Sequence, residues 1–376
     1  SAEPVEAYLR TLIQEIQQVR HILPQGLRAE RIHWGGGTPT LLDPAQMRRL
    51  AGALSDLMPL TESGEFSVEI DPNEIDAARL DALAAVGMNR ASIGVQDFDP
   101  EIQKIIGRDQ SYDVTQAAVD GLRARGVASL NTDLLYGLPK QTGAKIAASI
   151  QMLLSLNPDR IALYGYAHVP WMAKRQSLIP TDYLPAPEAR LSLFETAQKM
   201  LTWDGYHQLG IDHFARQSDS LALAARDGRL RRNFQGYTDD TAPVLIGFGA
   251  SSISKFPQGY VQNAAGTAAY QKAVRAGDVP TGRTHRFTKD DLLRARMIEM
   301  LMCEFRVDVA QLLAERLGPR EAIIGLLRRA AAPFDQLVTV TENALTLQPD
   351  AYPLARIVAR GLDAYSKTEA GHSSAV

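Results

Sequence analysis

Three consecutive glycines near the start of the chain are the first residues whose types suit ligand binding. They follow the apolar-leaning run Arg31–Trp34 and lead directly into Thr38-Pro39-Thr40. Glycines weaken regular structure, so they are favoured where the backbone needs a positive φ or where a ligand approaches it closely. The spacing matches neither the Walker pattern nor G-x-G-x-x-G. The glycines alone therefore leave a ligand loop and a plain tight turn as open interpretations.

Polar side chains also stand at the ends of other predicted strands. They are Glu69, Asp71, Gln96, Asp133 and His168, with Arg108 shortly after a strand. Polar groups at strand carboxyl ends are more often ligand-binding than structural in barrels. We favour that interpretation for Glu69 and Asp133, because a carboxylate accepts hydrogen bonds from an ammonium group or ribose hydroxyls. His168, His207 and His213 show no metal-binding spacing, so a structural role is favoured for them.

Two later segments have the composition of ligand loops. Gly247 and Gly249 lie in Leu245–Ile253, after an apolar run, and predict a loop that another group approaches closely. The segment Arg232–Thr238 mixes polar, aromatic and glycine residues. A substrate-facing loop and a structural loop are equally good interpretations of it.

The elements that must position these residues alternate between strand and helix. Hydrophobic patterns predict strands at 31–34, 65–71, 90–97, 128–136, 160–167 and 207–214, and helices at 4–23, 44–57, 74–86, 112–125, 146–153 and 187–203. Asp43 is the expected cap of the second helix. Six strands separated mostly by helices predict a parallel sheet. The pattern leaves a full barrel, an incomplete barrel and a doubly wound sheet open.

From about residue 288 the chain becomes rich in helix-forming residues, and 337–347 looks like a β-hairpin. A separate helical lobe with a small β wing is therefore expected.

Length and charge narrow the class of protein. The 376 residues suffice for a large domain and a smaller one. With 40 basic against 43 acidic residues, no electrostatic argument favours nucleic acid or an anionic membrane as a partner. No apolar run approaches the roughly 20 residues of a membrane span, and the start lacks the features of a signal peptide. We expect a soluble, cytoplasmic protein.

Cys303 is the only cysteine in the sequence. One cysteine excludes an internal disulfide and any cysteine-only metal site within these 376 residues. Its setting, Leu301-Met302-Cys303-Glu304-Phe305, predicts a buried structural thiol at the end of a helix.

Several segments, taken in order, resemble the oxygen-independent coproporphyrinogen III oxidases (dehydrogenases), which are radical SAM enzymes of haem biosynthesis. They are Trp34–Thr40, Val68–Pro72, Gly94–Phe98, Asp133–Thr142, Asp212–Ala215 and Asn233–Thr238. The last segment favours the true oxidases over the related haem-chaperone branch.

This resemblance implies a fold and two cofactor sites. The expected fold is an incomplete (β/α)6 TIM-like barrel of the radical SAM type over residues 1–285, followed by a mainly helical C-terminal domain over 286–376. Two S-adenosylmethionine (SAM) molecules are expected. Gly36, Glu69 and Ile253 match positions around the SAM that is cleaved. The positions matched around the second SAM are Gly37, Thr38, Gln96, Arg108, Asp133 and Ala167. No catalytic side chain is assigned.

The chain departs from the family pattern at the iron–sulfur cluster. The family's three cluster cysteines, C-x-x-x-C-x-x-C, lie just before the stretch at which this sequence begins, and none is present here. We therefore expect a [4Fe-4S] cluster in the complete protein that this chain does not hold, and an inactive chain without that segment. The alternative is a clusterless, non-catalytic tetrapyrrole-binding relative such as a haem chaperone.

The implied reaction is the oxidative decarboxylation of coproporphyrinogen III to protoporphyrinogen IX in anaerobic haem biosynthesis, which turns two propionates into vinyl groups. In the family, an electron from the cluster cleaves SAM to a 5′-deoxyadenosyl radical, which abstracts hydrogen from a propionate β-carbon before CO2 leaves. The expected partners are coproporphyrinogen III and an electron donor whose identity stays open. A monomer is expected.

Overall fold

The computed structural model describes residues 2–171, 173–334 and 336–365, which fall into two compact units. The first comprises Ser1–Ile93, Gln116–Leu130 and Asp240–Phe287. The second comprises Gly94–Thr115, Asn131–Asp239 and Thr288–Val376. The domain boundary expected between residues 285 and 286 is based on a change in sequence character, and it stays a prediction. The end of the expected C-terminal domain, residues 366–376, lies outside the described residues.

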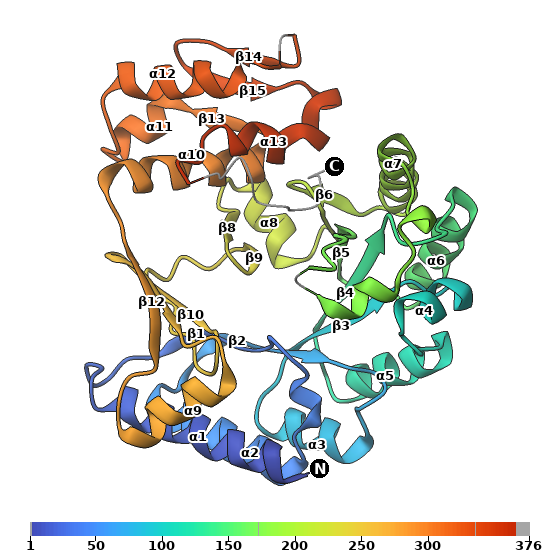
Figure 1. Ribbon diagram of the computed structural model, residues 1–376, viewed down its shortest axis with the longest axis vertical. Helices are drawn as coiled ribbons and strands as arrows, with labels where there is room; N and C mark the ends of the chain where they lie inside the picture. Colours follow the sequence, from blue (N-terminus) through green and yellow to red (C-terminus); the bar gives the residue numbers. More distant parts are fainter. Residues whose placement is uncertain (1, 172, 335, 366–376) are drawn as a thin grey trace. The chain divides into compact units, whose positions relative to one another are not determined.

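The main sheet has seven strands in the order β1-β2-β3-β4-β5-β7-β6. They are β1 (Ala29–Trp34), β2 (Leu60–Ile70), β3 (Arg90–Gln96), β4 (Ser129–Tyr136), β5 (Arg160–Gly165), β6 (His207–Leu209) and β7 (His213–Ala215), drawn in blue to yellow-green in Figure 1. The pairs β1–β2, β2–β3 and β4–β5 are parallel. The predicted α/β class with a mostly parallel sheet is confirmed.

The prediction of one strand over 207–214 is wrong. The segment forms two short strands, β6 and β7, which pair antiparallel with each other. Strand β7 also pairs antiparallel with β5. Between β6 and β7, Gly210 adopts a φ of 54°, a left-handed conformation that glycine reaches at little cost. The chain turns back there, so the last strands do not continue the parallel pattern.

Local capping residues determine where the first helices begin. Helix α1 spans Ala2–Arg20. Helix α2 (Pro44–Leu57) is capped by Asp43, which exchanges reciprocal hydrogen bonds with Gln46, so the predicted cap is confirmed. Helix α3 (Ala77–Ala85) begins later than predicted because Asp76 accepts a hydrogen bond from the backbone of Arg79.

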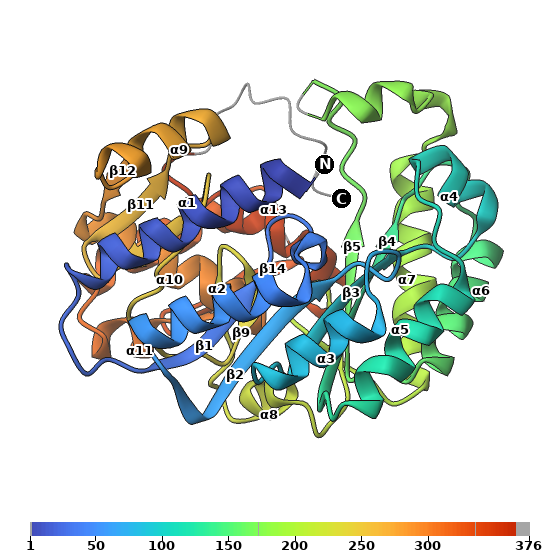
Figure 2. The same cartoon turned by 90° about the horizontal axis from the view of Figure 1, so that it is seen from below.

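A second, antiparallel sheet in the first unit was not predicted. It consists of β10 (Ile253–Phe256), β11 (Gly259–Asn263) and β12 (Thr281–Arg286), with α9 (Thr267–Ala276) between the last two strands. Figure 2 shows α9 beside α1, and the two helices are in contact. Leu245 and Lys255 exchange backbone hydrogen bonds of 2.9 and 2.8 Å, which closes the second glycine segment into a loop.

The remaining helices and a short hairpin complete the part of the chain before residue 288. They are α4 (Pro100–Ile106), α5 (Tyr112–Ala124), α6 (Gly143–Ser155), α7 (Pro187–Trp203) and α8 (Ser220–Arg226), and the hairpin of β8 (Arg231–Asn233) and β9 (Gly236–Thr238). The polar and aromatic segment at 232–238 is therefore a tight hairpin.

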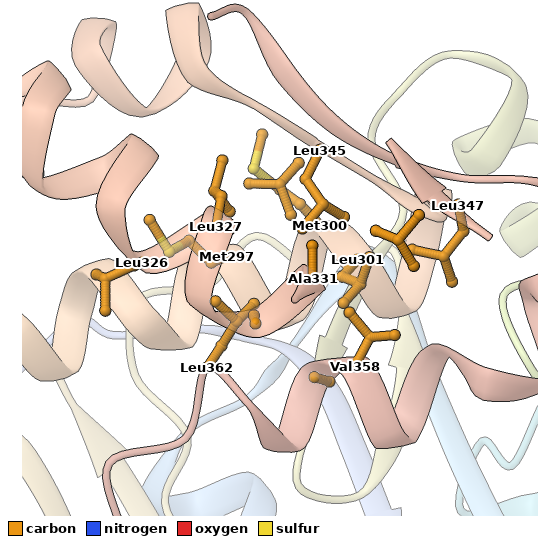
Figure 3. Close-up of a cluster of buried hydrophobic side chains, with 14 of the residues drawn as sticks. Met297, Met300, Leu301, Leu326, Leu327, Ala331, Leu345, Leu347, Val358 and Leu362 are labelled. Atoms are coloured by element: carbon orange, nitrogen blue, oxygen red, sulfur yellow. The ribbon is translucent and has the colours of Figure 1, made fainter. Parts of the chain in front are cut away.

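The C-terminal lobe has its own hydrophobic core. Its elements are α10 (Lys289–Glu304), β13 (Arg306–Asp308), α11 (Val309–Ala314), α12 (Arg320–Ala331), β14 (Val338–Val340), β15 (Ala344–Leu347) and α13 (Ala355–Arg360). Met300 and Leu301 of α10, Leu345 of β15 and Val358 of α13 are fully buried and pack in one cluster (Figure 3). The expected hairpin is confirmed as β14 and β15, and β13 adds a third strand. Cys303 is buried in the last turn of α10, as predicted.

The described helices include none that is long and apolar enough to cross a membrane.

Candidate functional site

A carboxylate at the end of β2 lies against the glycine turn at the end of β1. The parallel register pairs Trp34 with Val68, so Glu69 comes level with Gly35 and Gly36. The backbone N–H of Gly36 donates to Glu69 Oε2 at 3.3 Å. His33 Nε2 lies 3.5 Å from Glu69 Oε1. The structure thus brings together two of the residues that the sequence predicted, and adds His33.

Two of the three glycines have a structural reason to be glycine. A Cβ on Gly35 would lie 2.6 Å from Glu69 Oε1, so a side chain there would displace the carboxylate. Gly36 has a φ of 75°, which favours glycine. A Cβ on Gly36 or Gly37 would meet nothing within 4 Å. With Glu69 45% exposed, the turn offers a ligand a carboxylate acceptor beside open backbone.

The end of β3 carries the next predicted pair. Gln96 has a φ of 69°, which is uncommon for a residue other than glycine and often marks a functional segment. Its Nε2 atom lies 2.9 Å from where a Cβ on Gly94 would be. The Arg108 guanidinium donates to the Gly94 carbonyl and, from Nε, to Gln110 Oε1 at 3.0 Å. The side chains of Gln96 and Arg108 therefore both lie next to Gly94.

Asp133 lies on β4, where Asn131 and Asp133 share one face of the strand and the Asn131 amide donates to the carboxylate at 2.9 Å. Burial raises the pKa of Tyr164, and the negative charges of Asp133 and Asp212 raise it further. The charge of Asp133 therefore acts on the Tyr164 hydroxyl. The carbonyl of Ala167, after β5, accepts a hydrogen bond from Gln176 at 3.1 Å.

The predicted site residues are divided between the two units. Gly36, Gly37, Thr38, Glu69 and Ile253 belong to the first, whereas Gln96, Arg108, Asp133 and Ala167 belong to the second. Thr38 precedes a short 3-10 helix, Pro39–Leu41, and Ile253 begins β10. The assignment of each residue to one of two SAM molecules stays a prediction.

A buried charged group in the second unit was missed by the sequence reasoning. Asp212 Oδ1 lies 2.8 Å from His213 Nδ1, and Arg356 Nη2 donates to Asp212 Oδ2 at 2.6 Å. Burial by itself would raise the pKa of Asp212, but the hydrogen bond from His213 and the charges of His213 and Arg356 hold it below its ordinary value. No local sequence pattern predicts the contact with Arg356, because Arg356 lies 144 residues after Asp212.

Aromatic rings and a small cavity surround this group. The His213 ring packs edge-on against Tyr164 and Tyr237, with centroids 5.6 and 5.0 Å away. The adjoining cavity of about 40 Å³ is lined by Tyr136, Asp212 and Arg356 among others. A cavity of this size suits a water molecule rather than a cofactor. The burial of His213 agrees with the structural role favoured for it.

Comparison with known proteins gives consistent results. The radical SAM superfamily model matches residues 2–153. The chain is 55% identical over 376 residues to an oxygen-independent coproporphyrinogen III oxidase of Paracoccus denitrificans, covering all of this chain and 83% of that protein. It is 42% identical over 362 residues to the protein of that name from Bradyrhizobium diazoefficiens, covering 96% and 80%.

A solved structure extends the similarity to the fold. The radical SAM coproporphyrinogen III oxidase HemN from Escherichia coli matches with a TM-score of 0.91 and 36% identity, over 96% of this chain and 83% of that chain. The predicted fold class, an incomplete TIM-like barrel with a mainly helical C-terminal domain, is confirmed by this match.

Replacing Arg356 by alanine should destabilise the protein in a pH-dependent way. At pH 7 we expect the free energy of unfolding to fall by about 1–2 kcal/mol. This is less than for a fully buried ion pair, because the Arg356 side chain is 42% exposed. The lowered pKa of Asp212 makes its contribution present above the ordinary value of 3.8 and lost as the pH falls below it. The effect should therefore still be nearly complete at pH 5 and shrink only as the pH falls below 3.8. Denaturant titrations at pH 7 and pH 3 measure it.

The matched control is Arg329→Ala, which removes an exposed arginine from the same lobe and should leave stability nearly unchanged. An Arg356→Ala variant as stable as the wild type at pH 7, or equally destabilised at pH 7 and pH 3, would contradict the ion-pair interpretation.

Proposed function

Because the chain belongs to the oxygen-independent coproporphyrinogen III oxidases of the radical SAM superfamily, we propose that it oxidatively decarboxylates two propionates of coproporphyrinogen III to vinyl groups, which gives protoporphyrinogen IX and passes the electrons to an acceptor. The observation that carries the proposal is the 55% identity over the whole chain with a relative of that name. The arrangement of Glu69 and Gly36 at adjacent strand ends supports a cofactor site of the kind that this chemistry needs.

The residues at the end of β1 and β2 fit one SAM molecule. Glu69 can accept hydrogen bonds from an ammonium group or a hydroxyl, and the open backbone at Gly36 and Gly37 allows close approach. We assign Gly36, Glu69 and Ile253 to this molecule. When bound, SAM supplies the hydrogen-abstracting radical of the reaction. The protein's part is to orient the ligand and to exclude competing groups.

We assign the second SAM molecule to the residues matched in the family pattern, which are Gly37, Thr38, Gln96, Arg108, Asp133 and Ala167. The support is chemical. Asp133 can accept from ligand hydroxyls, and Arg108 is held by the carbonyl of Gly94 and the side chain of Gln110. An arginine fixed in this way loses little further freedom on binding.

The residues of this chain do not fit a [4Fe-4S] cluster. Such a cluster needs several thiolates, and the sequence has one cysteine. Burial, with help from the charges of Glu299 and Glu304, raises the pKa of the Cys303 thiol to about 12. Within the described ranges, no three His, Cys, Asp or Glu side chains are grouped so that they could hold a metal. We therefore derive no step through a cluster.

The hairpin β8–β9 supports a substrate-facing role for the 232–238 segment. Asn233 Oδ1 accepts from the backbone N–H groups of Gln235 and Gly236 at 2.8 and 3.2 Å, which fixes the turn. Phe234, in the turn of this hairpin, is 43% exposed. An exposed ring beside an amide suits a flat, partly apolar ring system with polar edges. We assign Phe234 and Gln235 to the binding of the tetrapyrrole substrate.

The proposal also includes an electron donor as a partner and a monomeric protein.

The single cysteine also supports a second candidate, a non-catalytic tetrapyrrole-binding protein such as a haem chaperone. The names of the whole-chain relatives favour the oxidase.

Glu69→Ala should weaken SAM binding without unfolding the protein. The variant loses a charge-assisted hydrogen bond, so we expect the dissociation constant to rise about 10- to 100-fold. Calorimetric titration of the chain extended by the C-x-x-x-C-x-x-C segment and reconstituted with iron and sulfide measures the affinity, and circular dichroism checks the fold. Glu74→Ala, an exposed glutamate shortly after β2, is the control and should bind as the wild type does. A folded Glu69→Ala variant with wild-type affinity and wild-type 5′-deoxyadenosine yield would refute the assignment.

Asp133→Ala should lower the number of bound SAM molecules from two towards one and reduce porphyrinogen turnover, since the carboxylate is assigned to the second molecule only. The stoichiometry is read from calorimetric titration in the same reconstituted protein. Asp113→Ala, which changes an exposed aspartate of α5, is the control. Two unchanged sites in the Asp133 variant would show that the placement is wrong.

The 376-residue chain by itself should hold no cluster. After anaerobic incubation with iron, sulfide and a reductant, we expect no absorption band typical of a [4Fe-4S] protein and no 5′-deoxyadenosine, because one buried thiol cannot replace three thiolates. The positive control is the same chain extended by a segment with the spacing C-x-x-x-C-x-x-C. Stoichiometric iron and sulfide in the unextended chain would overturn the ligand analysis.

A further inference from the structure

Helix α1 carries a buried glutamate with no part in the sites proposed for SAM. Glu15 is 2% exposed, and it forms no ion pair with the residues that the structure describes. Its carboxylate accepts three hydrogen bonds, from the Gly249 N–H at 2.8 Å, the Asn263 amide at 2.6 Å and the Tyr270 hydroxyl at 2.7 Å. A carboxylate is costly to bury, and neutral donors offset part of that cost.

The three donors come from separate elements of the first unit. Gly249 belongs to the loop Gly247–Ser252, which we call the Gly249 loop, whereas Asn263 ends β11 and Tyr270 lies on α9. Helix α1 lies beside α9 in Figure 2. Glu15 is therefore the acceptor at which a helix, a strand and a loop converge.

A second residue of α1 holds the same loop. The Ala250 N–H donates to the Tyr8 hydroxyl at 3.0 Å. Gly249 has a φ of 97°, and a Cβ on it would lie 2.8 Å from the Tyr8 oxygen. The loop thus presents two successive N–H groups to two side chains of α1, and a residue other than glycine at 249 would disturb both contacts.

The Gly249 loop is in direct contact with Ile253 and its neighbours. A Cβ on Gly247 would lie 2.6 Å from the Ile253 carbonyl oxygen, so the two backbones are in close contact. The Gly247 N–H donates to Ser254 Oγ at 3.0 Å. On the other side, the Asn263 N–H donates to the Ser252 carbonyl at 2.9 Å. A displaced Gly249 loop would therefore move the start of β10.

We infer that Glu15 is a positioning residue for the SAM molecule that is cleaved: it acts through the Gly249 loop to place Ile253 against that cofactor. The inference rests on the proposed function, which assigns Ile253 to this molecule. Glu15 itself touches only protein groups. A carboxylate suits the position because both of its oxygens are acceptors, whereas the amide of a glutamine would direct N–H groups at one of the three donors.

The test compares Glu15→Gln with the wild type in two measurements. Hydrogen exchange at Gly249 and Ala250, followed by mass spectrometry without ligand, reports the loop. Calorimetric titration with SAM, in the chain extended by the C-x-x-x-C-x-x-C segment and reconstituted with iron and sulfide, reports the affinity. We expect faster exchange at both amides and a dissociation constant raised about tenfold, which corresponds to about 1.4 kcal/mol. Tyr270→Phe, which removes one donor, should change both in the same direction by less.

Two controls separate positioning from a general loss of stability. Glu3→Gln changes an exposed glutamate of the same helix and should alter neither measurement. Leu345→Ala removes a fully buried side chain of the C-terminal core and should lower the melting temperature while leaving SAM affinity and exchange at Gly249 unchanged.

The outcomes are distinct. Faster exchange with weaker SAM binding supports the inference, whereas wild-type SAM affinity in Glu15→Gln overturns it and leaves the proposed function intact. Should Glu15→Gln not fold, Tyr270→Phe decides by the same two measurements. A wild-type protein that binds no SAM would instead overturn the proposed function.

Discussion

The parallel pairing of β1 with β2 is the constraint on which the candidate site depends. It puts a carboxylate, Glu69, beside a turn of three glycines, and the Gly36 N–H donates to it. Three glycines in a row weaken a fold, since they cost backbone entropy and bury no side chain. Two of them have a clear structural use here: Gly35 leaves room for the carboxylate, and Gly36 turns the chain.

Buried carboxylates fix the loops of both units, by different means. In the first unit, Glu15 is held by three neutral donors, and burial still raises its pKa. In the second unit, Asp212 is held by His213 and the charged Arg356, which lower its pKa in spite of burial. Buried polar groups of this kind add less to stability than well-packed apolar side chains would, but they accept only one arrangement of partners. That property suits segments that must present a backbone at a defined place.

Much of the fold could be predicted because the relevant signals are local. Asp43 before Pro44 marks the start of α2, and apolar alternation marks the strands of the main sheet. The failures also have local causes. At 207–214 a single glycine, Gly210, reverses a run that otherwise looks like one strand. Strand β12 was not predicted because Thr281–Arg286 contains no apolar residue and is mostly exposed. The segment therefore lacks the alternation of apolar and polar residues that indicates a strand.

The sequence by itself determined the class of fold, the family and the end of β2 at which the polar side chain of Glu69 stands, because these follow from short-range patterns. Only the tertiary structure decided which groups meet. Glu15 lies 234 residues before Gly249 and 248 before Asn263, and Asp212 lies 144 before Arg356. A hydrogen bond depends on distance and direction within about 3 Å. No residue pattern specifies that geometry until the intervening strands and helices have packed.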